Sequence, residues 1–278
     1  MKIGIYKNNN KVEATQSFNE LSTVLSKAGI DYFDLRLKDE TPDMCISIGG
    51  DGTFLKAAAF ALKYDVPVFG LNLGTLGMLT EMDANNIRGT IETIINKEYR
   101  IEERTCIDVH SLHNGESEYL GTAVNDCVIS QISINKVAYL ELLVNEETVE
   151  IYPCDGIVLS TQTGSTGYSL SAGGPIVIPG ADVMIASPKC PHFVNGRSVV
   201  TGPDATLSVK VVRSQSGVSV SLDGRETCDI QEGDKIICRK AEKSLKILRI
   251  NPPGFFEALR TKNARRDYIM EMRTKEGL

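Results

Sequence analysis

A short apolar strand pattern at Met44–Ile48 runs straight into Gly49-Gly50-Asp51-Gly52, and a helical pattern over 53–64 follows at once. The apolar positions of that helix are Leu55, Ala58, Ala59 and Leu62. A strand joined to a helix by a tight glycine turn is one half of a parallel βαβ unit. This junction predicts an open α/β sheet with helices on its faces.

The first hundred residues repeat this alternation of strand and helix. Further strand patterns lie at Lys2–Tyr6 and Val66–Gly70. Helical spacing recurs in Phe18, Leu21, Leu25 and Ala28 before Gly29, and in Ile87, Ile91, Ile94 and Ile95, with Asp83 as the expected helix cap. Residues 1–100 are therefore predicted to form a Rossmann-like α/β domain.

After residue 100 the helical patterns give way to short β-rich runs separated by turn residues. The runs are Ala123–Ser130, Ala138–Val144, Gly156–Thr161, Leu207–Val212, Val218–Leu222 and Lys235–Arg239. They predict a β-sandwich-like domain over 101–251. Pro252-Pro253-Gly254 then breaks the chain, and a helix over Phe255–Met272 is expected to return to the first domain as part of 252–278. The fold class expected is thus α/β plus all-β.

Asp51 is the unusual residue of the glycine turn. Such strand-to-helix turns bind ligands in open α/β sheets, glycine permits close approach, and the helix N-terminus attracts phosphate. A carboxylate beside phosphate is repulsive unless it accepts a proton or is linked to Mg²⁺, and a capping role in the turn is the third interpretation. The turn is neither a GxxxxGK[ST] loop nor a full GxGxxG fingerprint.

A second stretch, Asp155–Pro175, is rich in hydroxyl side chains and glycine and begins with an apolar strand. Hydroxyls and exposed amides supply directional hydrogen bonds to a polar ligand. Tyr168 offers a ring face for a base as well as a phenol. This stretch predicts a nucleoside pocket.

Composition limits the classes of function. The chain has 278 residues and a formal charge of −6, so bulk attraction to nucleic acid or to an anionic membrane is not expected. The sequence has no apolar run of membrane-spanning length, and its N-terminus, MKIGIYKNNN, lacks the apolar region of a secretory signal, so we expect a cytoplasmic protein. Seven cysteines without a CxxC favour free, mostly buried thiols, and no metal ligand set is predicted from the side chains.

Taken together, the two stretches resemble the NAD kinase family over most of the chain. The other landmarks are Leu71–Thr80, Asn125-Asp126, Cys190-Pro191-His192 and Asp223-Gly224. The resemblance implies transfer of the ATP γ-phosphoryl group to the 2′-hydroxyl of the adenosine ribose of NAD. It also implies Mg²⁺ with the ATP, and a homo-oligomer, dimer or tetramer.

The resemblance also assigns roles to single residues. Asp51 is the expected base, and Gly50, Gly52 and Thr53 are expected on the phosphate side. The remaining expected NAD contacts are Asn125 and Asp126 at adenine and ribose, Asp155 at nicotinamide, Thr166, Tyr168 and Ser171 at adenine, and His192 toward a neighbouring subunit's site.

Three residues depart from the family pattern. Met78 stands where the family usually has Phe, Asp126 where it has Glu, and Gly167 where it has Ala. A shorter carboxylate at 126 and a missing methyl at 167 bear on substrate affinity more than on the reaction type.

Two other functions fit part of the pattern. A lipid or sugar kinase shares the GGDG turn, and a non-catalytic NAD- or nucleotide-binding regulator would need no carboxylate at position 51. The acceptor separates the first from an NAD kinase, because a lipid kinase needs an apolar acceptor site. Product formation separates the second.

Overall fold

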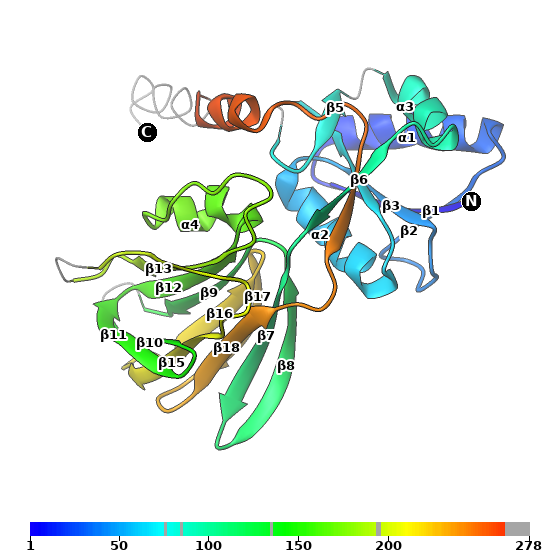
Figure 1. Ribbon diagram of the computed structural model, residues 1–278. Helices are drawn as coiled ribbons and strands as arrows, with labels where there is room; N and C mark the ends of the chain where they lie inside the picture. Colours follow the sequence, from blue (N-terminus) through cyan, green and yellow to red (C-terminus); the bar gives the residue numbers. More distant parts are fainter. Residues whose placement is uncertain (75–76, 84–85, 134–135, 193–195, 265–278) are drawn as a thin grey trace, which may run out of the picture. The chain divides into compact units, whose positions relative to one another are not determined.

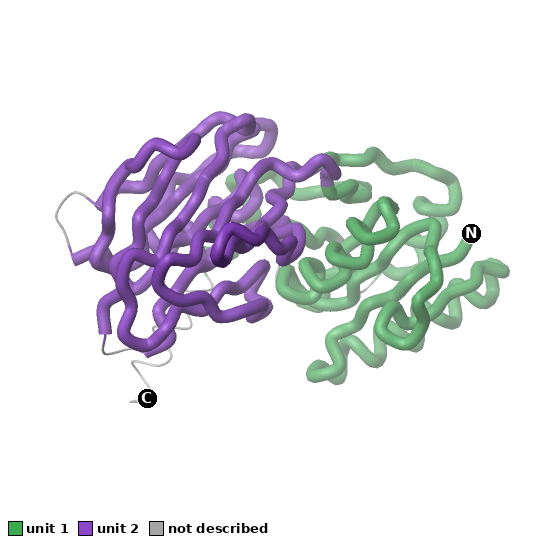
Figure 2. Tube along the Cα trace, turned by 90° about the horizontal axis from the view of Figure 1, so that it is seen from below, with its two compact units in different colours: residues 1–103, 245–278 green, residues 104–244 purple. Residues whose placement is uncertain are grey.

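The computed structural model describes residues 1–74, 77–83, 86–133, 136–192 and 196–264. It divides into two compact units, which are coloured separately in Figure 2. Unit 1 consists of residues 1–103 with 245–278, and unit 2 consists of residues 104–244. No helix in the described part of the chain has the length and apolar character needed to cross a membrane.

Unit 1 is built on a seven-stranded sheet in the order β2-β1-β3-β4-β19-β6, with β5 beside β4. The strands are β1 (Lys2–Lys7), β2 (Asp31–Asp34), β3 (Met44–Ile48), β4 (Val68–Asn72), β5 (Glu81–Asp83), β6 (Arg100–Arg104) and β19 (Leu245–Arg249). Strands β1 to β5 and β19 pair in parallel. Parallel pairing brings the carboxyl ends of β1, β3 and β4 to one edge of the sheet, where the loops that follow them meet.

Helices cover both faces of this sheet (Figure 1). They are α1 (Val12–Lys27), α2 (Asp51–Tyr64) and α3 (Ile87–Ile95). A further helical segment of unit 1 spans 255–264. Helices α1 and α3 pack on one face and share a core with the sheet, whereas α2 packs on β3 and β4 from the other face. The alternation of strands and helices predicted from the sequence is thus present in unit 1.

Two details of these helices differ from the expected pattern. The buried face of α2 is formed by Phe54, Ala57, Ala58 and Ala61, while Ala59 is exposed, because the helix begins at Asp51 and turns its bulkiest apolar ring inward. The expected cap Asp83 is wrong, since it ends β5. Asn86 caps α3 instead, with its side chain accepting a hydrogen bond from the Gly89 N–H.

Unit 2 contains two six-stranded antiparallel sheets that share one apolar core. The first has the order β11-β10-β15-β18-β7-β8 and the second the order β14-β13-β12-β9-β16-β17. The strands are β7 (Ile107–His113), β8 (Glu116–Ala123), β9 (Asp126–Gln131), β10 (Ala138–Val144), β11 (Glu147–Cys154), β12 (Gly156–Thr161), β13 (Met184–Lys189), β14 (Val199–Thr201), β15 (Leu207–Arg213), β16 (Val218–Leu222), β17 (Arg225–Ile230) and β18 (Lys235–Lys240).

The expected run Ala123–Ser130 is two strands, because the chain turns at Val124 and Asn125 between β8 and β9. At this turn the backbone N–H groups of Val124, Asn125 and Asp126 donate to the carboxylate of Asp223, at 2.9, 2.7 and 3.2 Å. A side chain almost a hundred residues away thus supplies the acceptors, which a local sequence pattern does not reveal.

The limits of the two units also differ from the sequence boundaries. Strands β6 and β19 belong to the sheet of unit 1, so the chain leaves this unit after Glu103 and returns at Leu245, rather than at 100 and 252. The part of the expected terminal helix beyond residue 264 lies outside the described residues.

Candidate active site

The glycine turn places Asp51 in the first turn of α2. Strand β3 ends at Ile48, and Gly50 caps the helix, with its carbonyl oxygen accepting from the N–H groups of Thr53 and Phe54 at 2.9 and 3.0 Å. The first turn of a helix carries N–H groups without intrahelical partners and a partial positive charge. The turn therefore combines an anion-attracting end with a half-buried carboxylate.

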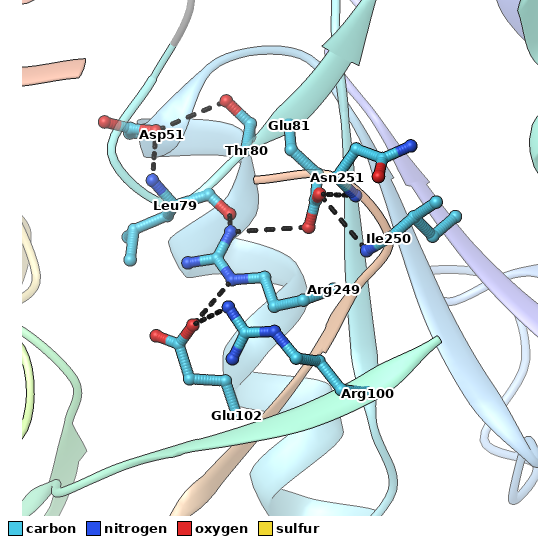
Figure 3. A network of polar contacts seen from close by, with 9 residues as sticks. All are labelled: Asp51, Leu79, Thr80, Glu81, Arg100, Glu102, Arg249, Ile250 and Asn251. Atoms are coloured by element: carbon cyan, nitrogen blue, oxygen red, sulfur yellow. Dashed lines mark hydrogen bonds and ion pairs between the residues drawn. The ribbon is translucent and has the colours of Figure 1, made fainter. Parts of the chain in front are cut away.

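The carboxylate of Asp51 is held by the loop that follows β4. Its Oδ2 accepts from the N–H of Met78 at 3.0 Å. Its Oδ1 accepts from the N–H of Leu79 at 3.1 Å and from Thr80 Oγ1 at 3.4 Å (Figure 3). Each carboxylate oxygen has two lone-pair sites, so the hydrogen bonds from the described residues leave one site on Oδ2 for a further donor. The side chain is oriented but still able to bind a hydroxyl group.

Gly77 permits this arrangement. A Cβ at this position would lie 2.1 Å from Asp51 Oδ1 and 2.4 Å from Thr80 Oγ1, far inside contact distance. A glycine is therefore required at the point where the loop passes the carboxylate.

An open pocket of about 500 Å³ lies beside the same turn. It is lined by the residues Tyr6, Lys7, Asn8, Asn9, Asn10, Lys11, Arg36, Gly50, Gly52, Thr53 and Lys56. Four of these carry positive charge, and three belong to the first turn of α2 and its cap. Lysine and arginine side chains together with a helix N-terminus form a good binding site for phosphate groups.

In unit 2 the predicted nucleoside stretch continues β12 as a short helical turn, Thr163–Thr166, followed by α4 (Tyr168–Ser171). It packs directly against the β8–β9 turn: a Cβ on Gly164 would lie 2.0 Å from the carbonyl oxygen of Asn125. Thr161 Oγ1 donates to the carbonyl oxygen of Val124 at 2.6 Å and accepts from the Gly164 N–H at 3.1 Å. The structure thus brings the stretch and Asn125 together.

Asn125 and Asp126 present polar groups with unusual properties. The side-chain oxygen of Asn125 is buried and accepts no hydrogen bond from the described residues. Burial raises the pKa of Asp126 to about 7, and the nearby Asp223 carboxylate adds to the rise, whereas a hydrogen bond from the Tyr168 N–H opposes it. Unsatisfied acceptors and displaced pKa values are typical of ligand sites.

The displaced pKa of Asp126 predicts a pH-dependent stability. The folded state favours the protonated carboxyl, so this stabilisation is complete below the ordinary value of 3.8 and is lost as the pH rises through about 7. The loss amounts to roughly 4 kcal/mol or less. We expect the melting temperature of the ligand-free protein to fall between about pH 4 and pH 7 and to level off above that, and Asp126→Asn, which is always neutral, to remove most of that fall. Equal slopes for the two proteins would contradict the assignment.

Only some of the other residues predicted to contact NAD lie close to one another. Asp155 Oδ1 accepts from Gln131 Nε2 at 2.8 Å, and its carbonyl oxygen accepts from Ser130 Oγ at 3.1 Å. Lys189 Nζ donates to the same Ser130 hydroxyl at 2.8 Å and lies 5.7 Å from the centre of the Tyr168 ring, so Asp155 and Tyr168 lie near one lysine.

Thr166 is buried, whereas Tyr168 is 42% exposed. Ser171 and His192 are exposed as well, and the N–H of His192 donates to the Pro153 carbonyl oxygen at 2.8 Å. Within the described residues no contact of these two side chains joins them to the Asn125–Asp126 turn.

The described residues contain no group of three His, Cys, Asp or Glu side chains arranged to hold a metal ion. All seven cysteines lie in the described ranges and are free, and five of them are buried, which confirms the expectation of unpaired thiols.

Comparison with known proteins decides the family. The model of the ATP-NAD kinase N-terminal domain matches residues 7–99, and that of the ATP-NAD kinase C-terminal domain matches residues 124–250. An NAD kinase from Acetivibrio thermocellus is 35% identical over 279 residues, covering 94% of this chain and 96% of that protein. The chain belongs to the NAD kinase family. The resemblance seen in the sequence motifs is confirmed.

Other members agree with this assignment. An NAD kinase from Lachnoclostridium phytofermentans is 36% identical over 237 residues, with 83% of each chain covered. Yeast NADH kinase complexed with NADH has a TM-score of 0.82 at 21% identity, covering 95% of this chain and 86% of that one. An NAD kinase from Archaeoglobus fulgidus in complex with ATP has a TM-score of 0.78 at 24% identity, covering 94% and 99%. At such identities the two structures support a common fold of two domains with mixed helices and strands.

The structure shows the surroundings of the three residues that depart from the NAD kinase pattern. Met78 holds Asp51 through its backbone N–H, a contact that any residue except proline can make. Gly167 lies beside the Asn125–Asp126 turn, where a Cβ would be 3.1 Å from the Gly164 carbonyl oxygen and 3.6 Å from Asp126 Oδ2. The missing methyl group thus leaves space next to the shortened carboxylate.

Several residues of the site were given no role by the sequence motifs. Asp223 and Gly77 lie in the landmarks Asp223-Gly224 and Leu71–Thr80, but the motifs do not reveal that Asp223 binds backbone N–H groups of a distant turn or that Gly77 lies against Asp51. The cationic pocket draws on loops after β1 and β2 as well as on α2. A search for lysines and arginines in the loops at the carboxyl ends of the strands would have found Lys11 and Arg36, but not their proximity.

Proposed function

We propose that this protein is an NAD kinase, which transfers the γ-phosphoryl group of ATP to the 2′-hydroxyl of the adenosine ribose of NAD and makes NADP. The observation that carries the proposal is the position of Asp51: a carboxylate oriented by three donors, in the first turn of a helix beside a cationic pocket. Phosphoryl transfer needs a carboxylate that can accept the nucleophile's proton and, close to it, a cationic site that binds the phosphoryl group.

In this proposal Asp51 accepts the proton of the ribose hydroxyl. That hydroxyl is a weak nucleophile at neutral pH, so it must be aligned with the γ-phosphorus and lose its proton as the bond to phosphorus forms. The free lone-pair site on Oδ2 can receive the hydroxyl hydrogen while the Met78 and Leu79 N–H groups hold the carboxylate in place.

The phosphate groups are assigned to the cationic pocket. Gly50, Gly52 and Thr53 line it and contribute the helix N-terminus, while Lys7 and Lys56 contribute charge. Magnesium enters as the Mg-ATP substrate and neutralises charge on the nucleotide phosphates. The described side chains supply no cage of their own for the ion, which favours this route.

NAD is assigned to the residues of unit 2. The unsatisfied Asn125 oxygen suits an amine or hydroxyl donor, and Asp126 suits the ribose hydroxyl groups. Tyr168 has an exposed ring for stacking. The proposed remaining contacts are Asp155, Thr166, Ser171 and His192.

Three further expectations remain proposals. We describe unit 1 as Rossmann-like and unit 2 as sandwich-like, which the parallel and antiparallel pairings favour. A cytoplasmic location agrees with seven free thiols. Assembly into a dimer or tetramer follows from the family resemblance alone.

The proposal is tested by incubating the purified protein with Mg-ATP and NAD and detecting NADP with an NADP-specific dehydrogenase. NADP formation at a rate proportional to enzyme concentration is the expected result. Parallel reactions with diacylglycerol or a hexose as acceptor test a lipid or sugar kinase. Tight NAD binding without product, measured by calorimetry, would instead indicate a binding protein and overturn the proposal.

A further inference from the structure

One residue of the loop that holds Asp51, Leu79, is bound through both of its backbone polar groups. The N–H of Leu79 donates to Asp51 Oδ1 at 3.1 Å, and the carbonyl oxygen of Leu79 accepts from Arg249 Nη1 at 3.1 Å (Figure 3). The guanidinium group and the carboxylate are thus connected through a single residue of backbone.

Arg249 is built into unit 1 rather than lying on its surface. It ends β19, and its side chain is 4% exposed. Its Nε donates to Glu102 Oε2 at 3.2 Å, and its Nη1 lies 3.6 Å from Glu81 Oε1. A planar guanidinium with donors fixed in a fork can serve a carbonyl oxygen and two carboxylates at once, which a lysine ammonium at the end of a flexible chain does poorly.

The two carboxylates are anchored in turn. Glu81, at the start of β5, is buried and its Oε2 accepts from the N–H groups of Ile250 and Asn251 at 3.2 and 2.9 Å. Glu102 lies on β6 and is partly buried. The group therefore ties the loop after β4 to the two strands, β6 and β19, on which the chain leaves unit 1 and returns to it.

We propose that Arg249 is a positioning residue for the phosphoryl transfer, which fixes the backbone of Leu79 and through it the orientation of the Asp51 carboxylate. The inference rests on the proposed role of Asp51 as the base. Arg249 itself touches neither the carboxylate nor, in this proposal, a substrate. Its loss should therefore lower kcat and leave the binding of NAD and ATP nearly unchanged.

The test variant is Arg249→Lys, which keeps the buried positive charge and so avoids leaving Glu81 and Glu102 unpaired. We expect kcat to fall by between about ten- and a hundredfold, as misplacement of a catalytic group does, with both KM values within about twofold. The matched control is Arg100→Lys, since Arg100 also faces Glu102 Oε2, at 3.7 Å, but is largely exposed. This control should keep its kcat.

A double-mutant comparison separates positioning from a general loss of structure. If Arg249 acts through Asp51, adding Arg249→Lys to Asp51→Asn should lower kcat no further, because the base is already absent. Multiplying losses, or an unchanged kcat in Arg249→Lys, would overturn the inference. So would a fall of kcat that only follows a lower melting temperature.

Hydrogen exchange keeps this inference distinct from the proposed function. The amide hydrogens of Met78 and Leu79 should exchange faster in Arg249→Lys than in Arg100→Lys, whatever reaction the protein catalyses. Unchanged exchange would overturn the structural part of the inference. Full turnover by Asp51→Asn would instead overturn the base assignment on which it rests.

Discussion

Replacing Asp51 with asparagine is expected to reduce kcat by about two to four orders of magnitude, the range usually supplied by a positioned general base. Asparagine has nearly the same shape and can keep its oxygen toward the N–H of Leu79. Its NH₂ group would then face the N–H of Met78, which now donates to Oδ2. The loss of that acceptor should cost about 1–3 kcal/mol of stability, which leaves the fold intact.

The measurement is NADP formation at saturating substrates, with circular dichroism to confirm the fold. Asp65→Asn is the control, because Asp65 lies at the other end of α2, where its left-handed backbone also suits asparagine. Its kcat should be unchanged. If Asp51→Asn retained the wild-type rate, Asp51 would be a turn residue and not the base.

Gly77→Ala is expected to lower kcat about as strongly, without removing any functional group. The added methyl carbon would start 2.1 Å from Asp51 Oδ1 and 2.9 Å from its Cγ, so the carboxylate or the loop has to move. A displacement of about 1 Å at a catalytic group can cost a hundredfold in rate. Overpacking of this kind should also lower the unfolding free energy by about 1–3 kcal/mol.

Gly74→Ala in the same loop is the matched control, because a Cβ there meets no atom of the described residues within 4 Å. It should retain both kcat and melting temperature. Wild-type activity in Gly77→Ala would mean that the contacts between the loop and Asp51 do not hold the carboxylate during turnover.

Much of the fold could be predicted from local sequence patterns. Strands β3, β10, β12 and β16 have the limits that their apolar runs indicated, because each run is bounded by residues that end a strand. Elements that depend on distant partners were not predicted. The short strand β2 exists because it pairs with β1, and β5 because it pairs with β4.

The residues of the site likewise divide into those that sequence motifs identify and those that depend on distant contacts. Asp51 and Asn125 were identified because glycine turns and a family motif mark them in the sequence. Arg249 was not identified, and Asp223 was marked as a family landmark without a role, since the two act across 170 and 98 positions of the chain on backbone atoms, whose partners no residue type specifies. Which backbone atoms a side chain reaches depends on the topology of the fold. Here strand β19 returns to the sheet of unit 1 after the whole of unit 2.

The most direct test of the central claim is the position of the new phosphate group. The product of NAD and Mg-ATP should be isolated and its ¹H–³¹P correlation spectrum recorded. The account predicts a phosphorus coupled to the 2′ proton of the adenosine ribose, formed by the wild-type protein and nearly absent with Asp51→Asn. A phosphate on any other hydroxyl group, or ATP consumption without a phosphorylated dinucleotide, would contradict it.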